Sequence, residues 1–136
     1  MDFASMKAKA EREWAWLENL PQPLITIGMG TCGRASGAGE VLATTRKTLK
    51  SIGILARIME VGCIGMCYAE PLMGVRKPGR PTVYYGGLTP EKTEMILTRY
   101  LCQDDPCRRW AEFSSGSGEI DTIPPIERHP MMRPQV

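Results

Sequence analysis

The stretch ILARIMEVGCIGMCYAEP, residues 54–71, runs from a hydrophobic segment straight into a loop that holds two cysteines. Its first eight residues are mostly Ile, Val, Leu, Ala and Met, which is typical of a strand. Cys63 and Cys67 follow among glycines, and Pro71 closes the loop. Such a loop suits a metal or cluster site, a redox dithiol, or a turn that merely contains two thiols. The positions of the other three cysteines help to decide between these interpretations.

A second hydrophobic segment lies upstream and also ends at a cysteine. LITIGMG, residues 24–30, predicts a short buried strand that enters a glycine-rich turn, and Cys32 follows at that turn. Residues 36–52 predict a helix that begins at Ser36 as N-cap and ends at Gly53. A strand, a helix and a second strand in this order predict a parallel pair with a right-handed crossover.

The remaining elements complete a small α/β fold. The sequence predicts further helices over residues 4–19 and 90–101, and a hairpin of two strands over 71–76 and 82–87. Together they predict a thioredoxin-like domain whose mixed four-stranded sheet is flanked by helices. We expect three parts, which are an N-terminal helix, this domain, and a linker with an extended C-terminal docking arm. Their predicted ranges are 1–20, 22–113 and 114–136.

The predicted topology brings three cysteines together. Both strands of a parallel pair end at the same edge of the sheet, so Cys32, Cys63 and Cys67 should cluster there. The predicted helix begins just after Cys32, and its positive end would stabilise thiolate charge. Three converging thiolates suit iron–sulfur or zinc chemistry. The alternative is three buried, inert cysteines at a tightly packed edge.

Two segments resemble a known family of electron carriers. TCGRASGAGEVL, residues 31–42, and VGCIGMCYAEPLMGV, residues 61–75, are similar to the thioredoxin-like 2Fe–2S ferredoxin domain. That domain occurs as the small ferredoxin subunit of NADH:quinone oxidoreductase. It also forms the N-terminal domain of flavoprotein subunits in NAD-linked hydrogenases and formate dehydrogenases. The resemblance covers about residues 22–102 and implies a 2Fe–2S cluster on Cys32, Cys63 and Cys67.

The resemblance also implies partners. The tail IPPIERHPMMRPQV, residues 123–136, is similar to the segment that leads into the FMN- and NADH-binding module of such flavoproteins. That module is absent from this sequence. We therefore expect an FMN/NADH-binding flavoprotein subunit and other iron–sulfur subunits as partners.

One departure from the family concerns the first ligand of the cluster. The family pattern is C-x4-C, a long gap, and then C-x3-C, which places the first cysteine at position 27. That residue is Ile27. The fourth ligand is therefore a residue other than cysteine, a ligand from a partner chain, or the cluster is absent. Glu70 is a candidate oxygen ligand, although a glutamate at such a place more often caps a loop or forms a salt bridge.

The other two cysteines and the single histidine are weaker candidates. Twelve helical residues after Pro90 span roughly 18 Å, which would carry Cys102 far from the three thiols. We expect Cys102 and Cys107 to be packed or idle thiols. One histidine excludes a Rieske-type pair, and we expect His129 to be solvated or to contact a partner.

Three functions follow from these residues. The first is single-electron transfer by a 2Fe–2S subunit of an NAD-linked flavoprotein complex. The second is a cluster-free docking subunit of the same kind of complex. The third is a dithiol oxidoreductase or a zinc site, although the C-x-x-C pattern of thioredoxin-type catalysis is missing. We expect no catalytic site in the chain itself, because GMGTCG lacks the spacing of a dinucleotide loop.

Bulk properties exclude other classes of protein. A chain of 136 residues with a net charge of +2 fits one domain, and its scattered Lys and Arg residues do not predict a nucleic-acid surface. Neither a signal peptide nor a run of 18 apolar residues is visible, so we expect a cytoplasmic protein without a transmembrane segment. Trp14 and Trp16 on the first helix, and residues 119–136, are candidate docking surfaces; otherwise one of the two Trp side chains packs on the core.

Overall fold

The computed structural model describes residues 2–30, 35–62, 69–116, 120 and 123–128. Within them the chain forms a five-stranded mixed sheet in the order β2-β1-β3-β4-β5. β1 and β2 are parallel, and the other neighbours are antiparallel. The predicted parallel pair and hairpin are thereby confirmed. The strands are β1 Leu24–Gly28, β2 Arg57–Val61, β3 Met73–Arg76, β4 Thr82–Tyr85 and β5 Ala111–Ser115.

The prediction of four strands was wrong, because β5 adds a fifth at the edge beside β4. Phe113 of β5 is fully buried and its ring stacks on Tyr84 with the centroids 4.7 Å apart. β5 runs to Ser115, two residues past the predicted end of the ferredoxin-like domain. Ile120 and Ile123 also belong to the core. The division of the chain into helix, domain and arm stays a prediction.

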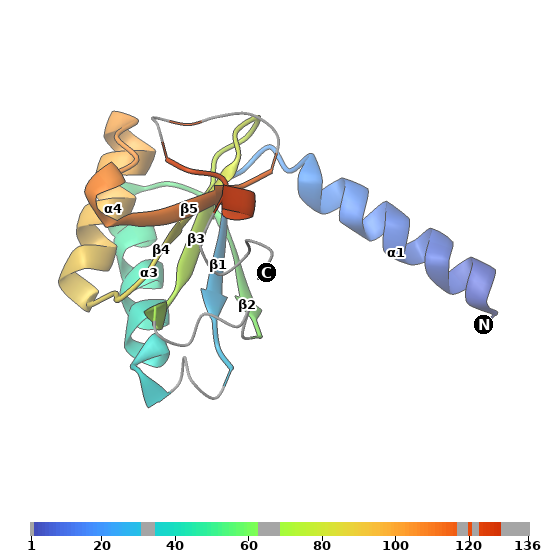
Figure 1. Cartoon of the computed structure of the whole chain (residues 1–136), viewed down its shortest axis with the longest axis horizontal. Helices are drawn as coiled ribbons and strands as arrows, with labels where there is room; N and C mark the ends of the chain where they lie inside the picture. Colours follow the sequence, from blue (N-terminus) through green and yellow to red (C-terminus); the bar gives the residue numbers. More distant parts are fainter. Residues whose placement is uncertain (1, 31–34, 63–68, 117–119, 121–122, 129–136) are drawn as a thin grey trace, which may run out of the picture.

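Two helices, α3 (Ala38–Ile52) and α4 (Pro90–Gln103), lie side by side on one face of the sheet (Figure 1). The strand residues that face them are fully buried and apolar, because side chains alternate between the faces of a strand. They are Ile25, Ile27, Met73, Val75, Val83 and Tyr85. The Thr89 hydroxyl caps α4 as predicted, since it accepts a hydrogen bond from the Lys92 amide at 3.2 Å.

The predicted N-cap of the other helix was wrong by one residue. α3 is preceded by Gly37 rather than capped by Ser36, and the φ of Gly37 is 99°. Glycine adopts this left-handed backbone without the steric cost that a side chain would add. Its conformation lets the chain turn into α3 at Ala38.

The opposite face of the sheet carries a smaller core, in which Leu72 and Phe113 pack with Ala69. Tyr84 and Ile126 pack against this cluster. Ile126 belongs to the short helix η3 (Ile126–Arg128), and the Ser114 amide donates to the Pro124 carbonyl at 2.9 Å. The described part of the C-terminal segment therefore lies along β5 and covers part of this face.

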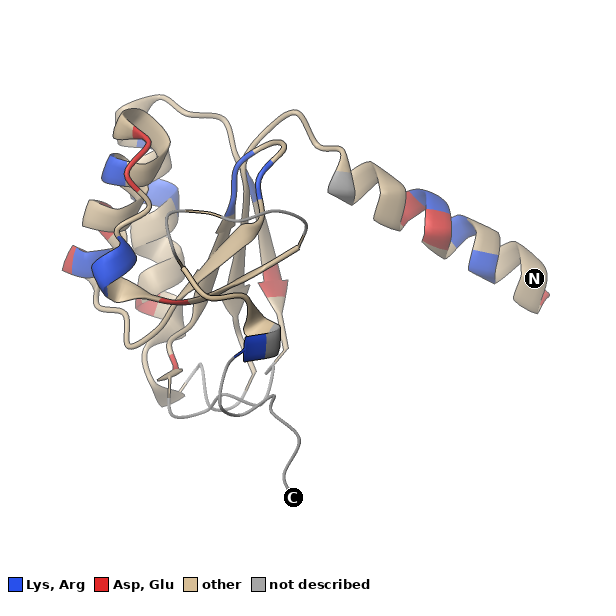
Figure 2. Cartoon of the chain, turned by 45° about the horizontal axis from the view of Figure 1, so that its top comes forward, with Lys and Arg blue, Asp and Glu red and all other residues tan. Residues whose placement is uncertain are grey.

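The N-terminal helix α1 (Phe3–Glu18) is confirmed and projects away from the sheet (Figure 1). Trp14 and Trp16 are 64% and 54% exposed, so the alternative in which one of them packs on the core was wrong. Charged residues of both signs alternate along the helix (Figure 2), with Lys7–Glu11 and Lys9–Glu13 at i,i+4 spacing. Among the described residues, no helix combines the length and the apolar character that crossing a membrane requires.

Candidate metal centre

The carboxyl ends of β1 and β2 meet at one edge of the sheet. Gly28 lies opposite Val61 in the parallel register. The Met29 amide donates to the Val61 carbonyl at 2.7 Å, and the Gly28 amide donates to the Leu72 carbonyl at 3.0 Å. The segment Gly28–Met29 is thus held between the end of β2 on one side and the residues just before β3 on the other.

The three predicted ligands Cys32, Cys63 and Cys67 lie outside the described residues. Their distance along the chain from this edge is nevertheless short. Cys32 comes three residues after Met29, and Cys63 comes two residues after Val61. Consecutive Cα atoms are 3.8 Å apart, so three residues reach at most about 11 Å. Two loops that start from hydrogen-bonded neighbours can therefore bring their thiols to one place.

The second loop returns to the same edge and is fixed there. Cys67 comes three residues before Glu70. The Ala69 carbonyl accepts from the Gly87 amide at 2.8 Å, and the Pro71 carbonyl accepts from the Leu88 amide at 3.3 Å. A Cβ atom on Gly86 would come within 2.8 Å of the Ala69 carbonyl oxygen, so this close approach requires a glycine. The backbone after β4 therefore fixes the exit of the loop.

Ile27, at the position where the family pattern places the first cysteine, is part of the core between the sheet and the two helices. Ile27 is fully buried in the cluster formed with α3 and α4. The Ile27 side chain is therefore not available to a group bound at the edge. Three thiols fit three of the four ligands of a 2Fe–2S cluster, and the fourth has to come from another residue.

Glu70 is the candidate oxygen ligand that the sequence indicated, and the structure places it at this edge. The residue is only 8% exposed. Its Oε2 atom accepts a hydrogen bond from the Leu72 amide at 3.0 Å. A Cβ atom on Gly28 would lie 3.2 Å from Oε2 and 3.3 Å from Oε1. The carboxylate thus fills the space beside the last residue of β1.

Cys102 belongs to the last turn of α4, which lies near the opposite edge of the sheet. Asp104 follows that turn and pairs with Lys77 and Arg80 of the β3–β4 turn. Because β3 is antiparallel to β1, this turn lies beside the beginning of β1. Figure 2 shows Lys and Arg residues at the hairpin tip. The structure therefore separates Cys102 from the ends of β1 and β2.

Cys107 is buried and packs in the core. Its backbone φ of 49° is in the left-handed region, and its amide donates to Asp105 Oδ1 at 3.0 Å. Burial raises the pKa of the Cys107 thiol, and the nearby Asp105 adds to this effect. A thiol with a raised pKa is a poor nucleophile and a poor metal ligand at neutral pH. Cys102 and Cys107 are both free cysteines, of which Cys107 is buried and Cys102 exposed; that neither has a role stays a prediction.

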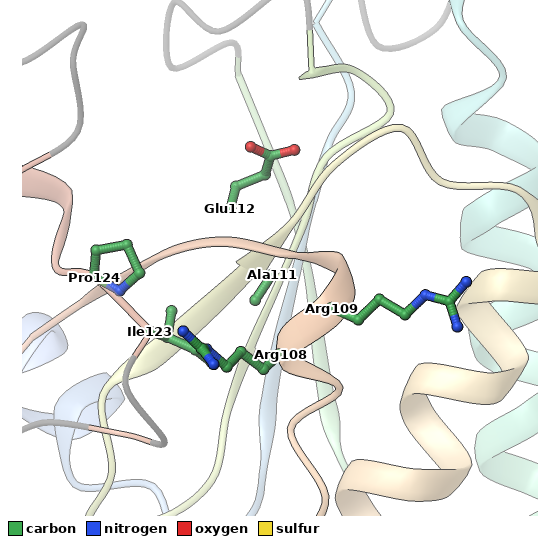
Figure 3. Close-up of a pocket in the computed structure, with 6 residues that line it drawn as sticks. All are labelled: Arg108, Arg109, Ala111, Glu112, Ile123 and Pro124. Atoms are coloured by element: carbon green, nitrogen blue, oxygen red, sulfur yellow. The ribbon is translucent and has the colours of Figure 1, made fainter.

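An open depression of about 470 Å³ lies between the short helix η2 (Arg108–Trp110), β5 and Pro124 (Figure 3). The Arg108 and Arg109 side chains point in different directions there, and Glu112 lies apart from both. These residues do not converge on one ligand. Among the residues that the structure describes, no group of three or more His, Cys, Asp or Glu side chains could hold a metal ion.

Comparison with known proteins identifies the fold. No protein-family model matches the chain. Subunit HndB of the NADP-reducing hydrogenase of Solidesulfovibrio fructosivorans is 25% identical over 84 residues, which are 61% of this chain and 67% of HndB. The sequence of HndB is thus related over most of its length.

Solved structures agree with the predicted topology. One structure of a thioredoxin-like [2Fe-2S] ferredoxin from Aquifex aeolicus superposes with a TM-score of 0.61 at 17% identity, over 73% of this chain and 96% of the ferredoxin. A second structure, of the wild-type ferredoxin, gives a TM-score of 0.57 at 18% identity, over 68% and 97% of the two chains. The chain therefore has the fold of the thioredoxin-like ferredoxins, as its sequence predicted.

Proposed function

We propose that this chain is an electron-transfer subunit that carries a 2Fe–2S cluster on Cys32, Cys63 and Cys67. It works within an NAD- or NADP-linked oxidoreductase complex. Its partners there are an FMN/NADH-binding flavoprotein subunit and other iron–sulfur subunits. The fold of the thioredoxin-like ferredoxins and the relationship to a subunit of an NADP-reducing hydrogenase support this proposal.

One observation carries the proposal. The two loops that hold the three cysteines leave the sheet from hydrogen-bonded neighbours, since the Met29 amide contacts the Val61 carbonyl at 2.7 Å. The second loop also returns there, at Leu72 beside Gly28. Three thiols in loops that leave from and return to one edge of a ferredoxin fold would supply three of the four ligands of a 2Fe–2S cluster.

The chain's own residues hold and shield the site. The bound cluster would supply a centre that accepts and releases one electron. α3 begins at Ala38, soon after Cys32, so its partly positive end lies at the same edge and favours negative charge there. Ala69 and Leu72, at the exit of the second cysteine loop, are buried and apolar, which favours the exclusion of water there. Solvent exclusion and nearby backbone dipoles are the means by which a protein sets a cluster potential.

The second candidate function is that of a docking subunit without a cluster. Its support is the projecting helix α1, on which Trp14 and Trp16 remain exposed together with Phe3 and Met6. Large aromatic side chains are enriched at protein interfaces and are seldom left exposed together. A cluster and a docking helix are compatible, so the content of iron decides between the two functions.

The test is the iron, acid-labile sulfide and zinc content of the full-length chain purified without oxygen. We expect about two iron and two sulfide per chain. Cys32→Ser, Cys63→Ser and Cys67→Ser should each lower the iron content severalfold. Cys102→Ser is the matched control and should retain it, because Cys102 lies on α4 near the opposite edge. Absence of iron and sulfide in the wild-type chain, including chain taken from its intact complex, would overturn the proposal and favour the docking subunit, or a zinc site if zinc replaced iron.

A further inference from the structure

Glu70 is the only charged side chain that is buried among the described residues. Removing a carboxylate from water costs several kcal/mol unless a cation, a metal or several hydrogen bonds compensate. Among the described residues, Glu70 forms no salt bridge, and its recorded hydrogen bond comes from the neutral amide of Leu72. One neutral hydrogen bond does not offset the burial of a full negative charge.

The surroundings of the carboxylate provide no cation on the sheet side. A narrow cavity of about 10 Å³ adjoins Glu70 and is too small to hold more than about one water molecule. Its lining includes Thr26, Leu72 and Tyr84, and Glu70 is the only charged residue in it. The carboxylate is therefore neither solvated by bulk water nor paired with Lys, Arg or His on this side.

The carboxylate lies at the end of β1, one residue along the strand from the position of the missing ligand and on the other face of the sheet. The family pattern takes its first ligand from the end of the first strand, where this chain has Ile27 in the helix-facing core. The next residue, Gly28, has no side chain, and both carboxylate oxygens lie within 3.3 Å of where its Cβ would be. Gly28 is also the residue that joins the two cysteine loops, through Leu72 and its neighbour Met29.

We propose that Glu70 is the fourth ligand of the cluster and binds iron through a carboxylate oxygen. This inference rests on the proposed function. Iron accepts carboxylate oxygen as well as thiolate sulfur, and binding would supply the positive partner that the buried charge lacks. The carboxylate reaches from the β3 side into the space beside Gly28, on the face of β1 opposite to the one that Ile27 occupies. The chain thus replaces a ligand of β1 by one that follows the second cysteine loop.

The first experiment compares Glu70→Gln with Glu60→Gln in the full-length chain. The glutamine side chain keeps an acceptor for the Leu72 amide, but the anionic ligand is lost. Glu60 is exposed near the end of β2, so its variant makes the same charge change at the same edge. We expect Glu70→Gln to lower iron from about two per chain to below one, or to change the electron paramagnetic resonance spectrum of the reduced cluster. Glu60→Gln should leave both unchanged.

A second variant transfers the ligand back to β1. In Gly28→Cys/Glu70→Ala the smaller side chain at position 70 opens the space that a thiol at position 28 needs, and the φ of Gly28 is not in the left-handed region. We expect this variant to hold about two iron per chain with the spectrum of an all-thiolate cluster. X-ray absorption at the iron edge of the wild-type chain should detect an oxygen neighbour, which this variant should lack. That measurement does not depend on whether Glu70→Gln folds.

The outcomes separate the two proposals. Full iron and an unchanged spectrum in Glu70→Gln, or an iron edge of the wild-type chain with sulfur neighbours alone, would overturn the role of Glu70 and leave the electron-transfer proposal standing. The role of Glu70 would then be to accept the hydrogen bond from the Leu72 amide. A wild-type chain without iron would overturn both.

Discussion

Arg80 and Asp104 form a two-pronged ion pair that joins the β3–β4 turn to the end of α4. Arg80 Nη1 donates to Asp104 Oδ1 at 2.6 Å, and Nη2 donates to Oδ2 at 3.0 Å. Lys77 Nζ also donates to Oδ1, at 2.7 Å. The hydrogen bonds from Arg80, followed by the one from Lys77, lower the pKa of Asp104 to about 2.

The first prediction concerns how the stability of the folded chain changes at acidic pH. A carboxyl whose pKa is lowered on folding stabilises the folded state above its unfolded pKa of about 3.9, and this contribution is lost as pH falls toward 2. Asp104→Asn should therefore lower the Tm between pH 5 and 7, and the difference from the wild-type chain should shrink between pH 4 and 2. Asparagine tolerates the φ of 57° at this position, so the backbone stays as it is.

Glu11→Gln is the control for this prediction, because Glu11 forms an exposed pair with Lys7 at 3.9 Å on α1. Exposed pairs of this kind contribute little, and we expect no such trend with pH. A Tm difference for Asp104→Asn that persists unchanged at pH 2 would show that the ion pair is not its source.

The parallel pair and the convergence of the two loop ends could be predicted because a mostly apolar segment followed by glycine and cysteine precedes each loop, although β2 itself holds Arg57 and Glu60 and is partly exposed. Ile25 and Ile27 are buried against the helices as such runs require. β5 was not predicted because its sequence, AEFSS, is short and mostly polar. What holds it is the stacking of Phe113 on Tyr84, a contact between residues 29 positions apart that no local pattern encodes.

The burial of Glu70 could not be predicted from the sequence either. A glutamate before a proline at the end of a loop is usually exposed. Its environment depends on Gly28, which lies 42 residues earlier and leaves room for the carboxylate. The sequence identified Glu70 as a possible oxygen ligand, but only the packing shows that it lacks a cation among the described residues of the edge.

A second prediction tests the close approach that fixes the exit of the second cysteine loop. Gly86→Ala would bring a Cβ atom within 2.8 Å of the Ala69 carbonyl oxygen and 3.0 Å of the Ala69 Cβ. Backbone has to move to relieve such a contact, so we expect a loss of about 1–3 kcal/mol in the free energy of unfolding. Urea denaturation measures this loss, and the iron content should fall with it if the exit of the loop positions Cys67.

Gly39→Ala is the matched control for that substitution. Gly39 lies in the first turn of α3, and a Cβ atom there would meet nothing within 4 Å. Alanine is the better helix former, so the variant should be as stable as the wild-type chain or more stable, by up to about 1 kcal/mol. Equal losses in both variants would refute the steric explanation for Gly86.

A third prediction compares two buried tyrosines. The Tyr85 hydroxyl donates to the Pro106 carbonyl at 2.5 Å, whereas the buried Tyr100 hydroxyl has no well-formed hydrogen bond among the described residues and only the Arg80 guanidinium near it. Tyr85→Phe leaves a buried carbonyl without its donor and should cost about 1 kcal/mol. Tyr100→Phe removes an unsatisfied hydroxyl and should be neutral or slightly stabilising. Urea denaturation of both variants measures the change in the free energy of unfolding. A larger loss of stability for Tyr100→Phe than for Tyr85→Phe would contradict the prediction.

The last prediction separates the two exposed tryptophans of α1. The Arg57 guanidinium lies over the Trp16 ring, 5.0 Å from its centroid, and no such contact with Trp14 is found among the described residues. Exposed cation–π pairs contribute about 0.5–1 kcal/mol. In double-mutant cycles with Arg57→Ala, measured by urea denaturation, Trp16→Ala should show a coupling energy of about 0.5 kcal/mol and Trp14→Ala a coupling near zero. Equal coupling for the two residues would mean that Arg57 does not hold α1 through Trp16. A selective coupling would show that the Arg57–Trp16 contact, beside the hydrogen bond from Arg76 to the Leu17 carbonyl, orients the projecting helix in solution and leaves Trp14 free to meet a partner.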